Sequence, residues 1–139
     1  MVCALSDYAT QVAWGCFGID LINVPNVTSF PPAGSGAEIG DGESNTNNIL
    51  NDCPIAPAAL AARSLGAEWF LPSAKELNQM YINKTTLEAV SGFSAFNSFY
   101  WSSTEDDVNV AWLQNFFSGI QSGYVKHGTN VSVRAVRAF

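Results

Sequence analysis

The final part of the chain has the residue pattern of β-strands. Four runs rich in β-branched and aromatic residues follow one another there: Phe99–Ser103, Val110–Phe117, Gln121–His127 and Asn130–Ala138. Such runs favour strands, and the glycine-containing stretches at residues 118–119 and 128–130 have the composition of hairpin turns. The pattern therefore predicts an antiparallel C-terminal meander.

The region that precedes these strands carries the clearest helical signal. Ser73 and Glu76 have the spacing of a capping box, in which each side chain bonds the other residue's backbone N–H. Leu77, Met80 and Tyr81 then recur at the i, i+3, i+4 spacing of one helix face. The pattern predicts an amphipathic helix that begins at this serine.

Three shorter helices and a long loop are predicted elsewhere. The helices cover Glu43–Asn51, Pro57–Leu65 and Thr86–Val90. Residues 1–17 are expected to form one or two short strands, and residues 23–42, with three prolines and many glycines and alanines, an irregular loop. Loops of this length inside a domain are usually functional or mobile. The order of strand, loop, helices and meander predicts an α+β domain.

Length and composition limit the class of protein. The 139 residues suit one domain, spanning 1–139, with one sizeable core. No apolar run is long enough to span a membrane. The first residues have neither the charged region nor the long apolar region of a signal peptide, so we expect a piece of a longer protein with any export signal upstream. The net charge of −6 argues against binding to nucleic acid or anionic membranes.

The charges are unevenly distributed along the chain. Residues 1–62 contain six acids and no lysine or arginine, whereas residues 108–139 contain Lys126, Arg134 and Arg137 and no acid. This asymmetry either places a basic surface on an acidic protein or disappears when the chain folds. The low charged fraction of 13% and the many small polar residues favour a secreted domain.

Three cysteines, Cys3, Cys16 and Cys53, fit an exported domain better than a zinc site. None lies in a CxxC motif, and the chain has a single histidine. We expect one disulfide and one remaining thiol and favour a Cys16–Cys53 bond, although sequence alone does not establish connectivity. Cys3 is then free or has a partner outside these residues.

Four motifs in a fixed order resemble a known bacterial family. They lie in the stretches WFLPSAKELNQMY (69–81), FYWSSTEDDVNVAWLQNFFSG (99–119) and VSVRAVRAF (131–139). The family shows a W-x-LP-[ST]-x-x-EL helix start, a YWSSTE box, an AW-x-x-F-x-x-G hairpin and a terminal VR-x-VR. Together they closely resemble the family that includes the C-terminal domain of the Legionella collagen-like protein. The resemblance covers essentially the whole chain, including WGC at 14–16 and Cys53.

The resemblance implies a fold and a function. It implies a variant of the C-type lectin-like fold in an extracellular, surface-attached bacterial adhesin. Such an adhesin recognises sulphated glycosaminoglycans, such as chondroitin sulphate or heparin, and supports host-cell attachment and bacterial aggregation dependent on divalent cations. A collagen-like stalk would precede the domain and requires three chains, so a homotrimer is expected.

The YWSSTEDD segment at 100–107 does not have the arrangement of a catalytic site. A glycosidase needs two carboxylates facing one cleft, but Glu105, Asp106 and Asp107 are contiguous, so their side chains point in different directions. A serine triad would need His127, the only histidine, and no nucleophile-elbow pattern surrounds either serine of the segment. We therefore expect a protein that is not an enzyme.

Most of the same segment is expected to be structural. Ser102, Ser103 and Thr104 can bond nearby backbone at a strand end. We predict an ion pair between Glu105 and a cation of the last strand, Arg137 or Arg134. The adjacent acids, Asp106 and Asp107, are the candidates for a calcium or magnesium ion, and no other cofactor is expected.

Glycosaminoglycan binding requires exposed cations, and the chain has no linear basic cluster. The candidates are dispersed: Lys126, His127, Lys84, Lys75, Arg63 and Arg134. Lys126 and His127 are expected at an exposed hairpin tip. Arg134 and Arg137 should face opposite sides of a strand, and which of them is exposed stays open. Among the aromatic residues, Tyr124 is the one expected to be exposed for stacking on a sugar.

Two functions are compatible with a trimer, and glycan binding separates them. Three weak basic patches in a trimer can bind a long polyanion with high avidity, and such binding should weaken with salt. The alternative is a structural trimerisation cap for a collagen-like stalk, without carbohydrate recognition of its own.

Overall fold

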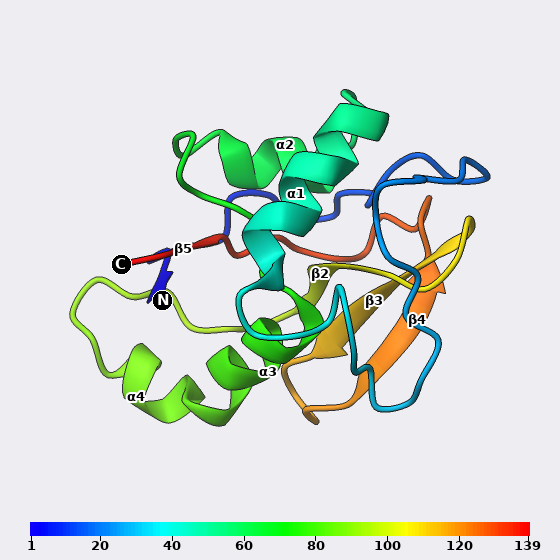
Figure 1. The fold of residues 1–139 in the computed structure, drawn as a ribbon. Helices are drawn as coiled ribbons and strands as arrows, with labels where there is room; N and C mark the ends of the chain where they lie inside the picture. The colour runs from blue at the N-terminus through cyan, green and yellow to red at the C-terminus, as the bar shows by residue number, and fades with distance from the viewer.

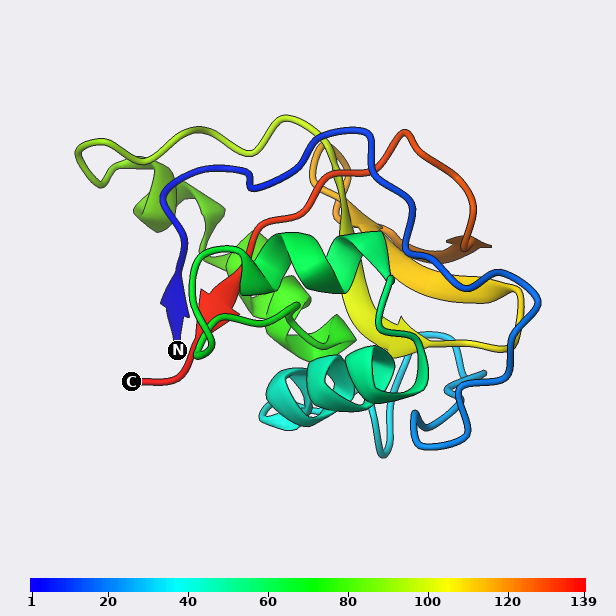
Figure 2. The same cartoon turned by 90° about the horizontal axis from the view of Figure 1, so that it is seen from above.

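Two small antiparallel sheets organise the fold, which a computed structural model describes for residues 1–139. β1 (Val2–Cys3) pairs with β5 (Val136–Arg137), so the two ends of the chain lie side by side (Figures 1 and 2). β2 (Phe99–Glu105), β3 (Val110–Asn115) and β4 (Gln121–Val125) form a three-stranded meander. Four helices precede this meander, which confirms the predicted α+β class.

The helices agree with the expected positions to within two residues. They are α1 (Asp41–Asp52), α2 (Pro57–Arg63), α3 (Ala74–Ile82) and α4 (Lys84–Glu88). The capping box of α3 is confirmed, since the Glu76 N–H donates to Ser73 Oγ at 3.3 Å and the Ser73 N–H donates to Glu76 Oε2 at 2.7 Å. The same Glu76 carboxylate accepts the Gly40 N–H, just before α1, and therefore joins the starts of two helices.

The last predicted strand does not pair with β4 as the next strand of the meander. Only Val136 and Arg137 form a strand. The residues before them bond the N-terminal segment on one side, and Ser132 forms a parallel bridge with Tyr100 of β2 on the other. Backbone N–H groups of Ala4, Tyr8 and Val12 donate to carbonyls at positions 135, 133 and 131. The prediction of a fourth meander strand over 130–138 was therefore wrong, because this segment bonds the N-terminal residues and β2 and does not pair with β4.

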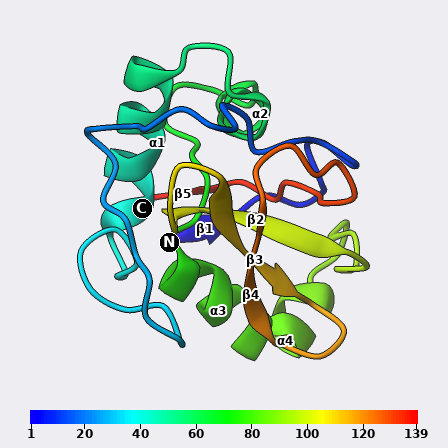
Figure 3. The same ribbon diagram turned by 90° about the vertical axis from the view of Figure 1, so that its right-hand side faces the viewer.

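The core lies in two main clusters and a small third one formed by Val27, Ala37 and Ala74. The larger cluster joins α1 and α2 to the sheet and includes Trp14, Ile49 and Trp101. The smaller one lies beneath α3 and includes Leu77 and Phe116. Figure 3 shows β2, β3 and β4 side by side, with α1 and α2 above them and α3 and α4 below. Different helices therefore lie on the two sides of the sheet.

Three buried indoles attach the N-terminal loops to the sheet. Trp14 Nε1 donates to the Ser102 carbonyl at 2.8 Å, and Trp101 Nε1 donates to the carbonyl of residue 12 at 2.7 Å. Trp112 Nε1 donates to the carbonyl of residue 27 at 2.8 Å. Because buried N–H groups require partners, these bonds hold the loop over residues 12–27 against the strands.

The hydroxyls of the YWSST stretch bond neighbouring segments, as predicted. Ser102 Oγ donates to the Trp112 carbonyl at 2.7 Å, and Thr104 Oγ1 donates to the carbonyl of residue 36 at 2.8 Å. Ser103 Oγ accepts from the Asn45 amide of α1 at 3.1 Å. The stretch therefore connects β2 with β3, α1 and the long loop.

The disulfide joins Cys16 to Cys53, the pair favoured from the sequence. It links the loop after Trp14 to the residue that follows α1, with 6.5 Å between the two Cα atoms. Cys3 is a free, half-buried thiol in β1, and burial raises its pKa to about 11.

Candidate functional site

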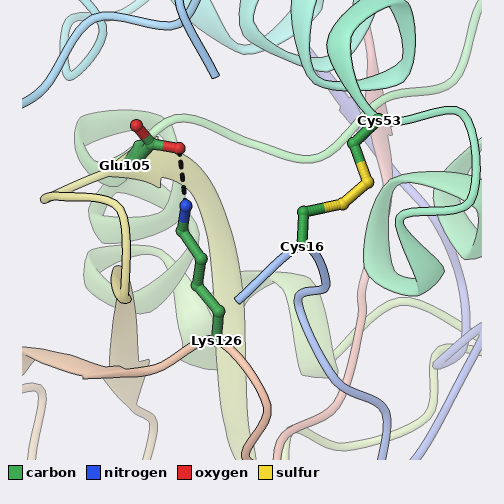
Figure 4. The surroundings of a disulfide bond; sticks show 4 residues. All are labelled: Cys16, Cys53, Glu105 and Lys126. Atoms are coloured by element: carbon green, nitrogen blue, oxygen red, sulfur yellow. Dashed lines mark hydrogen bonds and ion pairs between the residues drawn. A yellow bond between two sulfur atoms is a disulfide. The ribbon is translucent and has the colours of Figure 1, made fainter. Parts of the chain in front are cut away.

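Lys126 is not the exposed hairpin-tip cation that the sequence predicts. Its side chain is 0% exposed, and its Nζ lies 2.8 Å from Glu105 Oε2 (Figure 4). Its backbone is held on both sides, because its N–H donates to the Asn109 carbonyl and its carbonyl accepts from the Gly15 N–H. The predicted role of Lys126 in glycan binding was therefore wrong, since no ligand can reach the ammonium group.

The same contact corrects the predicted partner of Glu105, which is Lys126 and neither Arg137 nor Arg134. Burial raises the pKa of Glu105 to about 7, although the hydrogen bond and charge of Lys126 act in the opposite direction. The nearby Asp20 and Asp107 raise that pKa further. Glu105 Oε1 has no hydrogen-bond partner. The pair joins the end of β2 to the residue after β4 and is structural.

Arg134 is also buried, which overturns its predicted role in glycan binding. Only 1% of the residue is exposed. Its Nε lies 2.7 Å from Asp7 Oδ1, its Nη2 donates to the Ser94 carbonyl at 2.9 Å, and its guanidinium lies over Phe93 and Phe96. A buried guanidinium with this many partners holds segments together and is not available to a ligand.

Arg137 lies beside Trp69, and the basic surface that residues 108–139 could have provided does not form. Arg137 is half-buried, with its guanidinium 5.4 Å from the centre of the Trp69 ring. The other two cations of residues 108–139, Lys126 and Arg134, are both buried in ion pairs. Folding has therefore removed most of the charge asymmetry that the sequence displays.

The remaining predicted cations lie at the surface in different settings. Lys75 pairs with Glu38 at 2.6 Å, and both side chains are partly exposed. Arg63 is half-buried and donates to the carbonyls of residues 67 and 69 and to the Asn47 side chain. Lys84 donates to the Phe116 carbonyl at 3.1 Å. His127 is exposed, with its ring edge-on to Phe17 at 4.5 Å. Neither Lys84 nor His127 forms a salt bridge.

An open groove of about 340 Å³ lies on one face of the three-stranded sheet. It is lined by Phe99, Leu113, Ser122, Tyr124, Asn130 and Val131. The strand register explains the grouping: Leu113 lies opposite both Trp101 and Ser122, and Tyr124 follows two residues later on the same face. Tyr124 is 37% exposed and Phe99 40% exposed. The Tyr124 ring lies 6.0 Å from that of Trp101, which fixes its orientation.

The groove, which we call the aromatic groove, combines ring faces with neutral polar groups. Tyr124 and Phe99 provide flat apolar surfaces, and Ser122 and Asn130 provide a hydroxyl and an amide. Flat rings pack against the C–H faces of sugars, and hydroxyl and amide groups bond sugar hydroxyls. Such a lining can hold a pyranose ring.

Two of the predicted candidates, Lys84 and His127, do not line the aromatic groove but lie next to residues that contact its lining. Lys84 reaches the Phe116 carbonyl, and the ring of the adjacent Phe117 lies 6.5 Å from that of Phe99. His127 precedes Gly128, and the Tyr124 ring packs so closely on Gly128 that a β-carbon there would collide with it. The His127 ring itself packs against Phe17.

The sequence pointed to part of this site. Tyr124, Lys84 and His127 were candidates, whereas Phe99, Ser122 and Asn130 were missed. Strand alternation could have placed Ser122 beside Tyr124, because residues two apart share a face. No local signal could have found Asn130, because its segment does not return beside β4 but runs between the N-terminal residues and β2.

The predicted metal candidates remain separate from this groove. Asp106 is half-buried, and burial together with the charge of Asp107 raises its pKa. Asp107 is exposed and accepts the Asn109 N–H at 2.7 Å. The structure brings no three histidine, cysteine or acidic side chains together in an arrangement that could hold a metal ion.

Comparison with known proteins adds no relative. No family model matches the chain, and no curated protein matches it. None of the helices combines the length and the apolar character needed to cross a membrane.

Proposed function

We propose that this chain is the lectin-like domain of an extracellular bacterial adhesin and that it binds sulphated glycosaminoglycans without catalysing a reaction. The observation that carries the proposal is the aromatic groove on one face of the three-stranded sheet. In this proposal the groove holds one sugar ring of the chain, and Lys84, together with His127 when it is protonated, attracts sulphate or carboxylate groups on neighbouring units.

The fold and the covalent chemistry support the proposal. The paired terminal strands, the separate three-stranded sheet and the short helices suit a C-type lectin-like variant. A disulfide suits an extracellular domain, because disulfides persist in oxidising compartments. A binding role suits the aromatic groove, whose lining contains no carboxylate, histidine, lysine or arginine.

A trimer is part of the proposal, because the cationic contribution of one copy is small. Dispersed surface charges such as Lys84 give weak attraction at physiological salt. Three copies that contact one long polyanion would bind much more tightly than one, provided that their grooves can reach the same chain. Measuring the mass of the protein in solution tests the proposed trimer separately from glycan binding.

Titration of the protein with chondroitin sulphate and heparin at low and physiological salt tests the function. We expect affinity to fall as salt rises. Lys84→Ala or His127→Ala should weaken binding about two- to fivefold, and Tyr124→Ala about tenfold. Lys75→Ala is the matched control, because its charge is already paired with Glu38.

Binding that is insensitive to both salt and these three substitutions would overturn the proposal. A trimer that binds neither polysaccharide would favour the trimerisation cap instead. Release of shorter saccharides during the titration would contradict the proposal that the domain is not an enzyme.

A further inference from the structure

We propose that the domain has a second carbohydrate-binding groove, specific for neutral sugar units, on the opposite face of the three-stranded sheet. This groove, which we call the amide groove, has a volume of about 310 Å³ and lies between α3 and the long loop. Its principal lining residues are Pro31, Pro32, Lys75, Asn78, Gln79 and Gln121. The inference does not rest on the aromatic groove.

Strand alternation separates the two grooves. Ser122 of β4 lines the aromatic groove, and Gln121, one residue earlier, lines the amide groove. Neighbouring residues of a strand point to opposite faces of a sheet. Gln121 lies opposite Gln114 in the register, and the Gln114 side chain meets Asn78 of α3. The amide groove is therefore built on the face that packs against α3.

Internal hydrogen bonds orient two of the amides. Asn78 Oδ1 accepts from Gln114 Nε2 at 2.9 Å, so its own NH₂ group stays free to donate. Gln121 Nε2 donates to the Ala74 carbonyl at 2.7 Å, so its side-chain oxygen stays free to accept. Gln79 is exposed and makes no side-chain hydrogen bond. The groove thus presents oriented donors and acceptors, which reduces the ordering cost of binding.

The charge of the amide groove favours a neutral ligand. Lys75, its only cation, lies 2.6 Å from Glu38 Oε2, and the hydrogen bond from Lys75 keeps the pKa of Glu38 below its usual range. The lysine charge is therefore matched by a carboxylate that stays ionised. A lining of amides beside a neutralised ion pair offers both donors and acceptors, and vicinal hydroxyls of a hexose can satisfy both.

The shape of the groove agrees with this ligand class. Pro31 and Pro32 form part of the lining together with the amides, and their rings have little conformational freedom to lose. A lining that combines apolar ring atoms with amides suits a pyranose, which has both C–H faces and hydroxyls. With two grooves on opposite sheet faces, one domain could bind two glycan segments at once.

Amide-resolved NMR of the intact chain, titrated with glucose, galactose, N-acetylglucosamine and N-acetylgalactosamine, tests the inference. We expect at least one of these sugars to shift the amide signals of Gln79, Gln121 and their neighbours, with a dissociation constant on the order of 1 mM. Because no net charge is involved, this affinity should not change with salt.

Two variants identify the groove. Gln79→Trp should fill it and weaken sugar binding at least about tenfold, and because Gln79 is exposed the unfolding midpoint should stay unchanged. Asn51→Ala is the matched control, an exposed amide at the end of α1 that lies outside both grooves. Tyr124→Ala should leave neutral-sugar shifts at Gln79 unchanged, even if it abolishes glycosaminoglycan binding.

Three results would overturn the inference. They are the absence of shifts with all four sugars, shifts confined to the aromatic groove, and binding that persists in Gln79→Trp. None of these results contradicts glycosaminoglycan binding, and shifts confined to the aromatic groove would support it, so the failure of one proposal is distinguishable from the failure of the other.

Discussion

At the scale of single residues, two buried cations determine how distant segments meet. Lys126 and Arg134 are each paired with one carboxylate, Glu105 and Asp7 respectively. A buried charge is costly unless it is paired and hydrogen-bonded. Each pair therefore disfavours any arrangement that separates its partners, which lie 21 and 127 residues apart in the chain.

The raised pKa of Glu105 predicts a specific dependence of stability on pH. The folded protein holds the Glu105 proton up to a pKa of about 7, whereas the ordinary value is 4.5. Between these values the folded state binds more protons than the unfolded state, so the contribution of Glu105 to stability falls as pH rises through this interval and is constant above it. Denaturant unfolding of wild type and Glu105→Gln from pH 4.5 to 8 should show wild type losing stability relative to the variant.

The exposed Glu68 provides the control for this measurement. Glu68→Gln removes a carboxylate that lies at the surface, so its pH profile should follow that of wild type. A wild type that instead gains stability relative to Glu105→Gln as pH rises would contradict the prediction. It would mean that the attraction of Lys126 outweighs the cost of burial.

These residues also show what could not be predicted from the sequence. A lysine at a predicted turn is usually exposed, and nothing near Lys126 in the sequence indicates Glu105. The partners of Glu105 and Arg134 are set by how the loops cross, which single-residue preferences do not encode. Tyr124, Lys84 and His127, in contrast, could be chosen as candidates from the local sequence alone.

At the scale of elements, local signals were sufficient where the interactions are local. The start of α3 was predicted because the capping box is contained in four residues. The end of the meander was not, because residues 130–135 have strand-like composition but bond residues 4–12 and β2 rather than β4. Composition identifies an extended segment and cannot identify its partner.

The capping serine gives a prediction at this scale. Ser73 Oγ accepts the Glu76 N–H and donates to the Glu38 carbonyl at 2.7 Å, and the residue is fully buried. Ser73→Ala removes both bonds and should lower the free energy of unfolding by about 1–2 kcal/mol. Ser64→Ala, an exposed serine after α2, should cost less than about 0.5 kcal/mol. Equal effects of the two substitutions in chemical denaturation would show that the capping box contributes nothing specific.

At the scale of the whole molecule, long loops are held by a few connections that cross the fold. The paired ends of the chain, three indole N–H bonds and one disulfide fix segments that have almost no regular structure of their own. Both proposed grooves depend on such segments: Asn130 belongs to the C-terminal loop and Pro31 to the long N-terminal loop. How rigidly these loops are held should therefore affect glycan binding as well as the stability of the fold.

The disulfide is the connection whose loss can be measured most directly. It closes a loop of 37 residues, and the closure should stabilise the fold by about 3–4 kcal/mol, chiefly by limiting the unfolded chain. The double variant Cys16→Ser/Cys53→Ser should lose this amount in denaturant unfolding. Cys3→Ser is the matched control and should change the free energy of unfolding by less than about 1 kcal/mol, because Cys3 forms no disulfide. If Cys3→Ser proved as destabilising as the double variant, the stability would reside in the burial of cysteine side chains and not in the covalent closure between Cys16 and Cys53.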